Sequence, residues 1–225
     1  MIVHSLDPVD VMLSTFRKLS KERQIAILDA AARVFAQNGY YRANVADICR
    51  GARISNGALY KYFKNKRDVF NSVFDRTVRL FSIDPERFFS TRNSVYQRLR
   101  DLLNATTRLA EIHPEYITVY FDLGSPSMSG MAASLSERIE QPAKAIWLSL
   151  VEEGKRRGEI DKEIDSNVAS YIIDDYVMLF MFSCVSDHYD RRFSSYFGEK
   201  NRTFTNREKI RIVLNSIKMV LSQKN

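Results

Sequence analysis

The segment from Ile54 to Lys66, with the sequence ISNGALYKYFKNK, combines the residue types of a helix that lies against a polyanion. Ser55 can cap the start of a helix by accepting a hydrogen bond from a backbone N–H of the first turn. Leu59 and Phe63 are four residues apart and would face a core, which leaves the polar residues on the opposite side. Gly57 removes a side chain where the unpaired N–H groups of the helix start attract anions. The pattern predicts a helix that contacts DNA.

Two more helices are predicted before this segment. The stretch from Asn44 to Ala52 has Asn44 as its N-cap, and two short helices joined by a few residues form a helix-turn-helix. The stretch from Lys21 to Gln37 has apolar residues at spacings of three and four, with Ser20 as cap and Gly39 as stop, and would support the other two. The residues expected to face inward from it are Ile25, Leu28, Ala32 and Phe35.

The run AILDAAARVFAQNGYYRANVADICRGARISNGALYKYFKNKRDVF resembles the amino-terminal domain of the TetR (tetracycline-repressor) family of bacterial regulators. The resemblance includes Phe35 with Asn38-Gly39, the VADI at Val45 to Ile48, and LYKYFKNK at Leu59 to Lys66. It implies an all-α protein of about nine helices, with a three-helix DNA-binding domain followed by a helical domain that binds a ligand and dimerises. The predicted divisions are an extension at 1–19, a DNA-binding domain at 20–66, and an effector-binding and dimerisation domain at 67–225.

Two positions depart from the family's pattern. Arg53 stands where the family usually has a turn glycine, so either this arginine adopts a left-handed conformation or the turn adjusts. Cys49 stands where the family prefers alanine, because a small side chain lets the two helices approach closely. We interpret Cys49 as a packing residue in preference to a redox group.

Positive charge is concentrated in the same part of the chain. Residues 17–67 contain twelve Lys or Arg and three acidic residues, a net +9, whereas the whole chain of 225 residues carries +7. A local excess of this kind is typical of a phosphate-binding face. Scattered lysines usually form only a solvated surface, but we expect phosphate contacts from those beside the helix-turn-helix. The predicted DNA-binding residues are Asn44, Ser55, Asn56, Gly57, Ala58, Tyr60, Lys61, Tyr62 and Lys66.

The first nineteen residues allow two interpretations. Arg17 and Lys18 next to the first helix would form part of a mobile arm that reaches the DNA backbone. The alternative is a short extra helix that docks through Val11, Met12 and Phe16.

Long helices are expected in the rest of the chain, which contains few prolines and glycines. They are predicted at 66–81, 95–112, 114–123, 131–157, 166–197 and 205–223. The last two are apolar on more than one side, so they need a partner beyond their own domain. In the resembling family these helices pair across a two-fold axis, which places two recognition helices on a palindromic operator. The predicted interface residues are Ile172, Leu179, Phe182, Ile210, Val213, Ile217 and Val220.

A candidate effector pocket is predicted among the helices of the second domain. Aromatic and Met side chains suit an apolar or aromatic ligand, although each residue alone is more typical of an ordinary core. Asp174 and Asp175 are unusual inside an apolar helix, and we favour a structural role for them over ligand contact. The candidate pocket residues are Phe89, Tyr116, Tyr120, Phe121, Trp147, Tyr171, Asp175 and Met178.

An enzyme is not expected. The three histidines have no metal-ligand spacing, and the chain has no catalytic serine motif, phosphate loop or dinucleotide fingerprint. No catalytic residue, metal or cofactor is therefore assigned. The two cysteines lie far apart, which argues against a disulfide framework, and no apolar run approaches a membrane span. These features predict a cytoplasmic bacterial protein that associates with the nucleoid when it is bound to DNA, with no membrane partner.

The predicted function is transcriptional regulation. We expect a homodimeric repressor that binds a palindromic operator in double-stranded DNA and is released by a small, apolar or aromatic effector. The alternative is a ligand-independent architectural or chromosome-organising DNA-binding protein.

Overall fold

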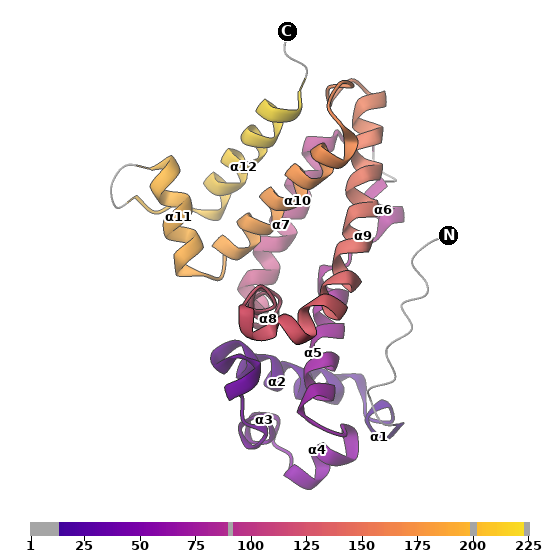
Figure 1. Ribbon diagram of the computed structural model, residues 1–225, viewed down its shortest axis with the longest axis vertical. Coiled ribbons are helices and arrows are strands. Elements are labelled where there is room, and N and C mark those ends of the chain that lie inside the picture. The colour runs from indigo at the N-terminus through magenta and orange to yellow at the C-terminus, as the bar shows by residue number, and fades with distance from the viewer. Residues whose placement is uncertain (1–13, 90–91, 199–201, 223–225) are drawn as a thin grey trace. The chain divides into compact units, whose positions relative to one another are not determined.

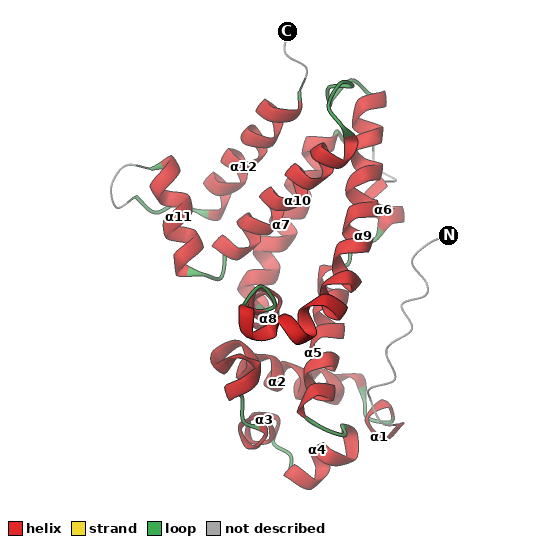
Figure 2. Cartoon of the chain, in the orientation of Figure 1, coloured by secondary structure: helices red, strands yellow, loops and turns green. Residues whose placement is uncertain are grey.

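The computed structural model describes residues 14–89, 92–198 and 202–222, and within these ranges every regular element is helical (Figures 1 and 2). This confirms the all-α prediction. The helices are α1 (Ser14–Arg17), α2 (Lys21–Arg42), α3 (Val45–Ala52), α4 (Asn56–Tyr62), α5 (Lys66–Phe81), α6 (Pro85–Phe89), α7 (Val95–Ile112), α8 (Pro114–Asp122), the 3-10 helix η1 (Pro126–Met128), α9 (Ser129–Arg156), α10 (Ser166–Ser183), α11 (Asp187–Phe197) and α12 (Asn206–Leu221).

The chain forms two compact units. The first comprises Met1–Ser82 and Thr118–Ala133, and the second comprises Ile83–Ile117 and Ser134–Asn225. This division differs from the predicted boundary at residue 67, because α5 packs against α2 within the first unit.

Apolar residues at helical spacing build the core of the first unit. The Ser20 hydroxyl caps α2 by accepting a hydrogen bond from the Arg23 N–H, 3.3 Å away. Gly39 interrupts this helix with φ 68° and ψ 164°, so the predicted stop is a kink after which one more helical turn follows. Ile25 was expected to face inward but is 38% exposed, and Ile27 is buried instead. The buried aromatic side chains of this core include Phe16, Phe35, Phe63, Phe70 and Phe74.

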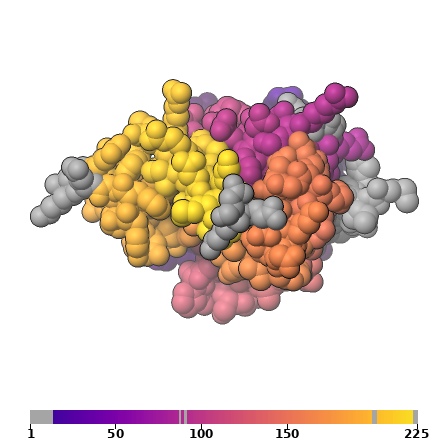
Figure 3. Space-filling view, turned by 90° about the horizontal axis from the view of Figure 1, so that it is seen from above, coloured from indigo at the N-terminus to yellow at the C-terminus, as the bar shows by residue number. Residues whose placement is uncertain are grey.

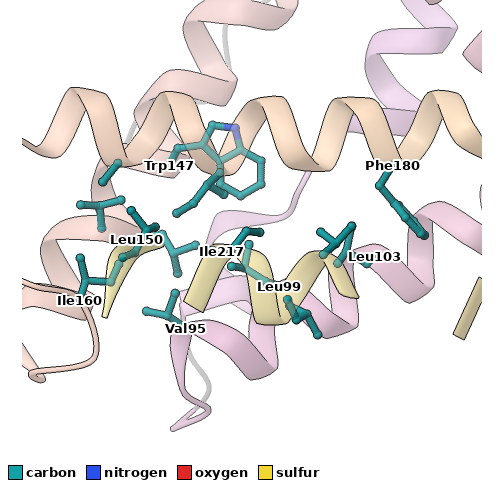
Figure 4. Close-up of a cluster of buried hydrophobic side chains, with 14 of the residues drawn as sticks. Val95, Leu99, Leu103, Trp147, Leu150, Ile160, Phe180 and Ile217 are labelled. Carbon is teal, nitrogen blue, oxygen red and sulfur yellow. The ribbon is translucent and has the colours of Figure 1, made fainter. Parts of the chain in front are cut away.

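The core of the second unit lies between α7, α9, α10 and α12 (Figure 4). The helices α7, α10 and α12 pack side by side, and α9 contributes the indole of Trp147. Fully burying one such aliphatic or aromatic side chain stabilises a fold by roughly 1.5–3 kcal/mol. The labelled members of this core are Val95, Leu99, Leu103, Trp147, Leu150, Ile160, Phe180 and Ile217.

The single helix predicted at 166–197 is wrong. The structure has two helices there, α10 and α11, which are bent by 115° at the break. Asp187 and Asp190 lie in the first turn of α11, where carboxylates favour a helix start. Among the described residues, no single helix is long and apolar enough to cross a membrane, and only the bent pair α10–α11 reaches that length and composition together.

The amino-terminal extension docks onto the first unit where the structure describes it. Phe16 of α1 is fully buried, and its ring centroid lies 5.8 Å from that of Tyr62 and 4.8 Å from that of Phe63. The Thr15 hydroxyl donates a hydrogen bond to the Lys61 carbonyl oxygen. For residues 14–17 the structure therefore shows the docked helix, the second of the two predicted alternatives, and not a mobile arm. Val11 and Met12 lie outside the described residues.

The predicted dimer interface needs correction. Phe182, Ile210, Val213 and Ile217 are buried within a single chain, and Ile217 has no exposed surface at all. Ile210, Val213 and Ile217 are occupied by the core of their own unit, and Phe182 packs on Tyr189 of α11, so these four side chains are buried without a partner chain. Ile172 is partly buried, and Leu179 and Val220 are the predicted interface residues that remain exposed.

Candidate DNA-binding surface

Side-chain caps define the starts of the two helices in the helix-turn-helix. The Asn44 carboxamide oxygen accepts a hydrogen bond from the Ala46 N–H at 2.9 Å, which caps α3. The Ser55 hydroxyl accepts from the Ala58 N–H at 3.1 Å, which caps α4. Both caps were predicted from the sequence and are confirmed. Through these hydrogen bonds Asn44 and Ser55 fix the residues at which α3 and α4 begin.

The turn between α3 and α4 contains a left-handed arginine. Arg53 has φ 53° and ψ 52°, so the first of the two predicted possibilities is the one that occurs. Its N–H donates to the Arg50 carbonyl oxygen at 3.2 Å, and its own carbonyl oxygen accepts from the Arg23 guanidinium at 3.1 Å. These contacts hold a conformation that an L-residue otherwise disfavours.

Cys49 packs between the helices of this unit. Its side chain is buried, and burial raises the pKa of its thiol, which disfavours the reactive thiolate. The geometry fits the packing interpretation.

The outer face of α4 is polar and accessible. Asn56, Gly57 and Lys61 are exposed, and Tyr60 is 51% exposed, whereas Leu59 on the same helix is buried. The helix therefore separates its apolar and polar sides as the spacing predicts. Such a face offers amide, hydroxyl and ammonium groups, which bind phosphates and base edges.

Gly57 has no packing reason to be a glycine. A methyl group added there would meet only the Ser55 hydroxyl oxygen, 3.9 Å away, and the residue has no positive φ. Open space above this backbone is what a close approach by a phosphate requires. Neighbouring Ala58 is half-buried, and Tyr62 turns its ring toward Phe16 and is also half-buried.

Lys66 has a different role from the predicted phosphate contact. Its ammonium donates to the carbonyl oxygens of Tyr41 and Ala43 at 3.1 and 3.2 Å, and it lies 4.8 Å from the ring centroid of Tyr40. The side chain thus satisfies backbone acceptors at the end of α2. The side chain of Lys64 is exposed nearby and is better placed to reach a phosphate.

The predicted effector-pocket residues lie in different environments. Tyr120 and Phe121 belong to the first unit, and the other six belong to the second. Trp147 is buried, and its indole N–H donates to a carboxylate oxygen of Asp174 at 2.7 Å, which gives Asp174 the structural role favoured above. Tyr171 is 67% exposed, so its placement in an interior pocket is wrong. Tyr116 is fully buried, and the half-buried residues are Phe89, Asp175 and Met178.

A cavity of the second unit lies elsewhere. It is lined by α10, α11 and α12, with Tyr176, Phe193 and Ile212 among its walls, and it includes none of the eight predicted pocket residues. Sequence reasoning missed it because it depends on the unpredicted break between α10 and α11.

The fold and this surface define a helix-turn-helix DNA-binding protein, and comparison with known proteins gives its family. Residues 27–73 match the family described as bacterial regulatory proteins, tetR family. The chain therefore carries a DNA-binding domain of the TetR family of transcriptional regulators.

The named relatives of the chain are also regulators of transcription or metabolism. The chain is 27% identical over 160 residues to the fatty acid metabolism regulator protein of Bacillus subtilis (strain 168), covering 69% of this chain and 80% of the relative. It is 26% identical over 154 residues to the HTH-type transcriptional repressor KstR2 of Mycobacterium tuberculosis, covering 68% and 76%. The structure is similar to that of FadR from Bacillus subtilis in complex with stearoyl-CoA, with a TM-score of 0.63, 21% identity, and coverage of 87% of this chain and 96% of that one.

Proposed function

We propose that this regulator is a homodimeric repressor that binds a palindromic operator through the outer face of α4 and is released by a small molecule. The observation that carries the proposal is the α4 face, which is exposed, polar and capped beside an inward-facing Leu59. Relatives named as repressors support the direction of regulation. The proposed DNA contacts are Asn44, Ser55, Asn56, Gly57, Ala58, Tyr60, Lys61 and Tyr62, with Lys64 in place of Lys66.

Selection of DNA sequences from a random pool by the purified protein would test operator binding. The expected result is one palindromic sequence with half-sites about one helical turn apart. Binding of many unrelated sequences with similar affinity would support the architectural alternative and contradict the repressor.

Tyr60→Phe then tests the recognition face. The exposed hydroxyl of Tyr60 offers a polar tip, so its removal should weaken operator binding while leaving the fold intact. Tyr196→Phe is the matched control, because Tyr196 is also exposed but lies on α11. Equal operator affinities for the two variants would exclude a DNA contact by the Tyr60 hydroxyl.

The proposed dimer uses exposed apolar residues of α10 and α12. Val168, Tyr171 and Leu179 lie along one stripe of α10, and Met219 and Val220 are exposed on α12. Monomers seldom leave such a set uncovered, and a second copy of these helices would cover it.

Val220→Asp tests this interface, with sedimentation as the measurement. Val220 is 43% exposed in one chain, so a carboxylate there should leave the fold intact but oppose burial by a partner. Asn104→Asp adds the same charge at an exposed position of α7, outside the proposed interface, and should remain dimeric. A Val220→Asp dimer as stable as that of the control would remove this surface from the proposal. Ile217→Asp is unsuitable, because Ile217 is buried in the core of its own chain.

The proposed effector has a large apolar part. Phe89, Tyr116, Trp147, Asp175 and Met178 of the second unit are the proposed contacts, and a related regulator was solved with stearoyl-CoA. We infer an acyl-CoA or a similar amphipathic molecule.

Because Trp147 is the single tryptophan, its fluorescence should respond to the effector. Stearoyl-CoA should release the operator, whereas coenzyme A without an acyl chain should not; equal effects of the two would contradict an apolar effector.

A further inference from the structure

The helix α4 is short and buries little surface of its own. It has seven residues, Asn56–Tyr62, of which Leu59 is buried. An isolated helix of this length is not stable in water, so tertiary contacts must hold it. Its C-cap residue Phe63 is fully buried and has an extended backbone, which takes the chain out of the helix. The orientation of α4 therefore depends on what packs against its carboxy-terminal end.

α1 packs against this end of α4 (Figure 1). The ring of Phe16, which has no exposed surface, lies with its centroid 5.8 Å from that of Tyr62 and 4.8 Å from that of Phe63. The Thr15 hydroxyl donates a hydrogen bond to the carbonyl oxygen of Lys61. This oxygen belongs to the last turn of α4, where carbonyl groups have no partner within the helix. α1 thus supplies both apolar contact and a hydrogen-bond donor.

α1 is attached in turn to the start of α2. The Leu19 N–H donates to the Phe16 carbonyl oxygen at 3.1 Å, which closes the turn after α1. The side-chain amide of Gln24 in α2 donates to the carbonyl oxygens of Leu19 at 2.8 Å and Arg17 at 3.3 Å. Since α2 packs against both α3 and α5, α1 connects the end of α4 to the core of the first unit.

We propose that Phe16 and Thr15 are positioning residues for operator recognition, which set the orientation of α4 without touching DNA. The inference rests on the proposed function, because it takes the outer face of α4 as the DNA-binding surface. Phe16 packs directly on Tyr62, a proposed DNA contact. It also packs on Phe63, and Lys64, the proposed phosphate contact, is the next residue of the chain.

Orientation and charge act on different kinds of DNA binding. A helix that is correctly oriented for only part of the time lowers the operator affinity in proportion to that fraction. Binding to DNA of unrelated sequence depends on phosphate contacts and charge, and it tolerates a change of orientation. A positioning residue should therefore alter the ratio of the two affinities, whereas a residue that only stabilises the fold should lower both together.

Phe16→Leu and Thr15→Val test the proposal on the full chain. The first keeps an apolar side chain but removes the ring contacts, and the second removes the donor to Lys61 with little change of shape. The two probes are the selected operator and a duplex of unrelated sequence. Operator affinity should fall by about tenfold in Phe16→Leu and about threefold in Thr15→Val. Affinity for the unrelated duplex and the salt dependence should be unchanged, because neither residue is charged.

Hydrogen exchange gives a readout without DNA. The Phe63 N–H donates to the Leu59 carbonyl oxygen at 2.9 Å and so reports on the end of α4. Its exchange should be faster in both variants, whereas amides of α2 and α5 should keep their protection. Uniformly faster exchange throughout the first unit would show a general loss of stability and would contradict a positioning role.

Phe35→Leu is the matched control for the lost ring. Phe35 is 1% exposed in the same unit, and its ring contacts those of Tyr40 and Phe70, which lie outside α4. This variant should lower the thermal stability of the protein but leave the ratio of operator affinity to unrelated-duplex affinity unchanged.

Thr107→Val is the matched control for the lost hydroxyl. The Thr107 hydroxyl also donates to a backbone carbonyl oxygen, that of Leu103, but in the second unit. Its removal should leave both DNA affinities unchanged. Sedimentation checks that the dimer is intact in Phe16→Leu and Thr15→Val, since α12, whose surface lies next to that of α11 in Figure 3, belongs to the second unit and is unaltered.

Two outcomes of the DNA measurements would overturn the proposal. One is an equal loss of affinity for the operator and the unrelated duplex, and the other is an unchanged operator affinity in both variants. Thr15→Val provides the comparison even where Phe16→Leu does not fold. Failure of the unsubstituted protein to select an operator would contradict the proposed function itself, and it is recognised before any variant is compared.

Discussion

The ammonium of Lys209 in α12 lies 2.5 Å from a carboxylate oxygen of Asp190 in α11 and 2.9 Å from the backbone carbonyl oxygen of Ser183 at the end of α10. One lysine therefore connects three helices at the break in the carboxy-terminal part of the chain. Its side chain is 4% exposed, whereas that of Asp190 is 35% exposed. The two partners should consequently differ in what their removal costs.

Asp190→Ala should destabilise the protein more than Lys209→Met. Without Asp190, a buried ammonium keeps only uncharged acceptors, and breaking a buried pair in this way costs about 3–5 kcal/mol. Without Lys209, the Asp190 carboxylate can hydrate at the surface and only the Ser183 carbonyl oxygen loses a buried donor, so the loss should be roughly 1.5–3 kcal/mol. Urea unfolding of both variants and of the double variant measures the difference. The reverse order would show that Lys209 stabilises this corner by packing and not by its charge.

Local signals allowed much of the fold to be predicted. α5 and α7 begin and end where the sequence placed them, because caps such as Asn65 and Ser94 and one apolar stripe are short-range features. The break after α10 has no glycine or proline to mark it. It is held by Lys209, which lies 26 residues away from Ser183. The local signals that could have indicated it are Ser186 at the N-cap position and the acidic residues at the start of α11.

The site was predictable in part for similar reasons. The caps and the outward-facing residues of α4 depend on neighbours in sequence, and they are found where expected. Lys66 was misinterpreted because the carbonyl groups that it satisfies, those of Tyr41 and Ala43, lie 25 and 23 residues earlier. The apolar stripe of α12 has the same pattern whether it faces a core or a partner, so the sequence could not assign Ile217 to its own core.

The stability contribution of Asp174 should depend on pH. Burial raises the pKa of its carboxyl above the ordinary value of 3.8, even though the Trp147 N–H opposes this effect. The folded state therefore keeps a proton that the unfolded chain releases. The stabilisation is complete below the ordinary pKa and is lost as pH rises through the raised one.

Asp174→Asn measures this dependence. The carboxamide still accepts the hydrogen bond from Trp147 but does not ionise, so the unfolding free energy of the variant relative to the unsubstituted protein should rise with pH above about 4 and then level off. Chemical unfolding at several pH values gives the comparison, and Asp101→Asn on the exposed side of α7 is the control. A constant difference across pH 4–8 would mean that the Asp174 pKa is the same in both states.

Substitutions of Lys66 and Lys64 should affect different properties, the first the stability of the fold and the second the affinity for DNA. Lys66→Met leaves two carbonyl oxygens at the end of α2 without their donor, so the unfolding free energy should fall by about 1–3 kcal/mol. Lys64→Met removes an exposed ammonium, so stability should be unchanged, while operator affinity falls for all sequences and the salt dependence becomes shallower by about one charge. Thermal unfolding and binding at several salt concentrations distinguish the two. A full salt dependence in Lys64→Met would exclude its phosphate contact.

Gly57→Ala should make the protein more stable and a weaker DNA binder. Alanine is favoured over glycine inside a helix by roughly 0.5–1 kcal/mol, and the added methyl group meets nothing closer than 3.9 Å in the free protein. The same methyl group would obstruct a phosphate that approaches the backbone at the start of α4. Gly51→Ala is the control, because Gly51 is also exposed and helical, but its methyl group would point toward Ala30 at 3.4 Å. Both variants should unfold at higher urea concentration, and only Gly57→Ala should lose operator affinity. If Gly57→Ala binds the operator as tightly as Gly51→Ala does, the DNA backbone does not approach α4 at this glycine.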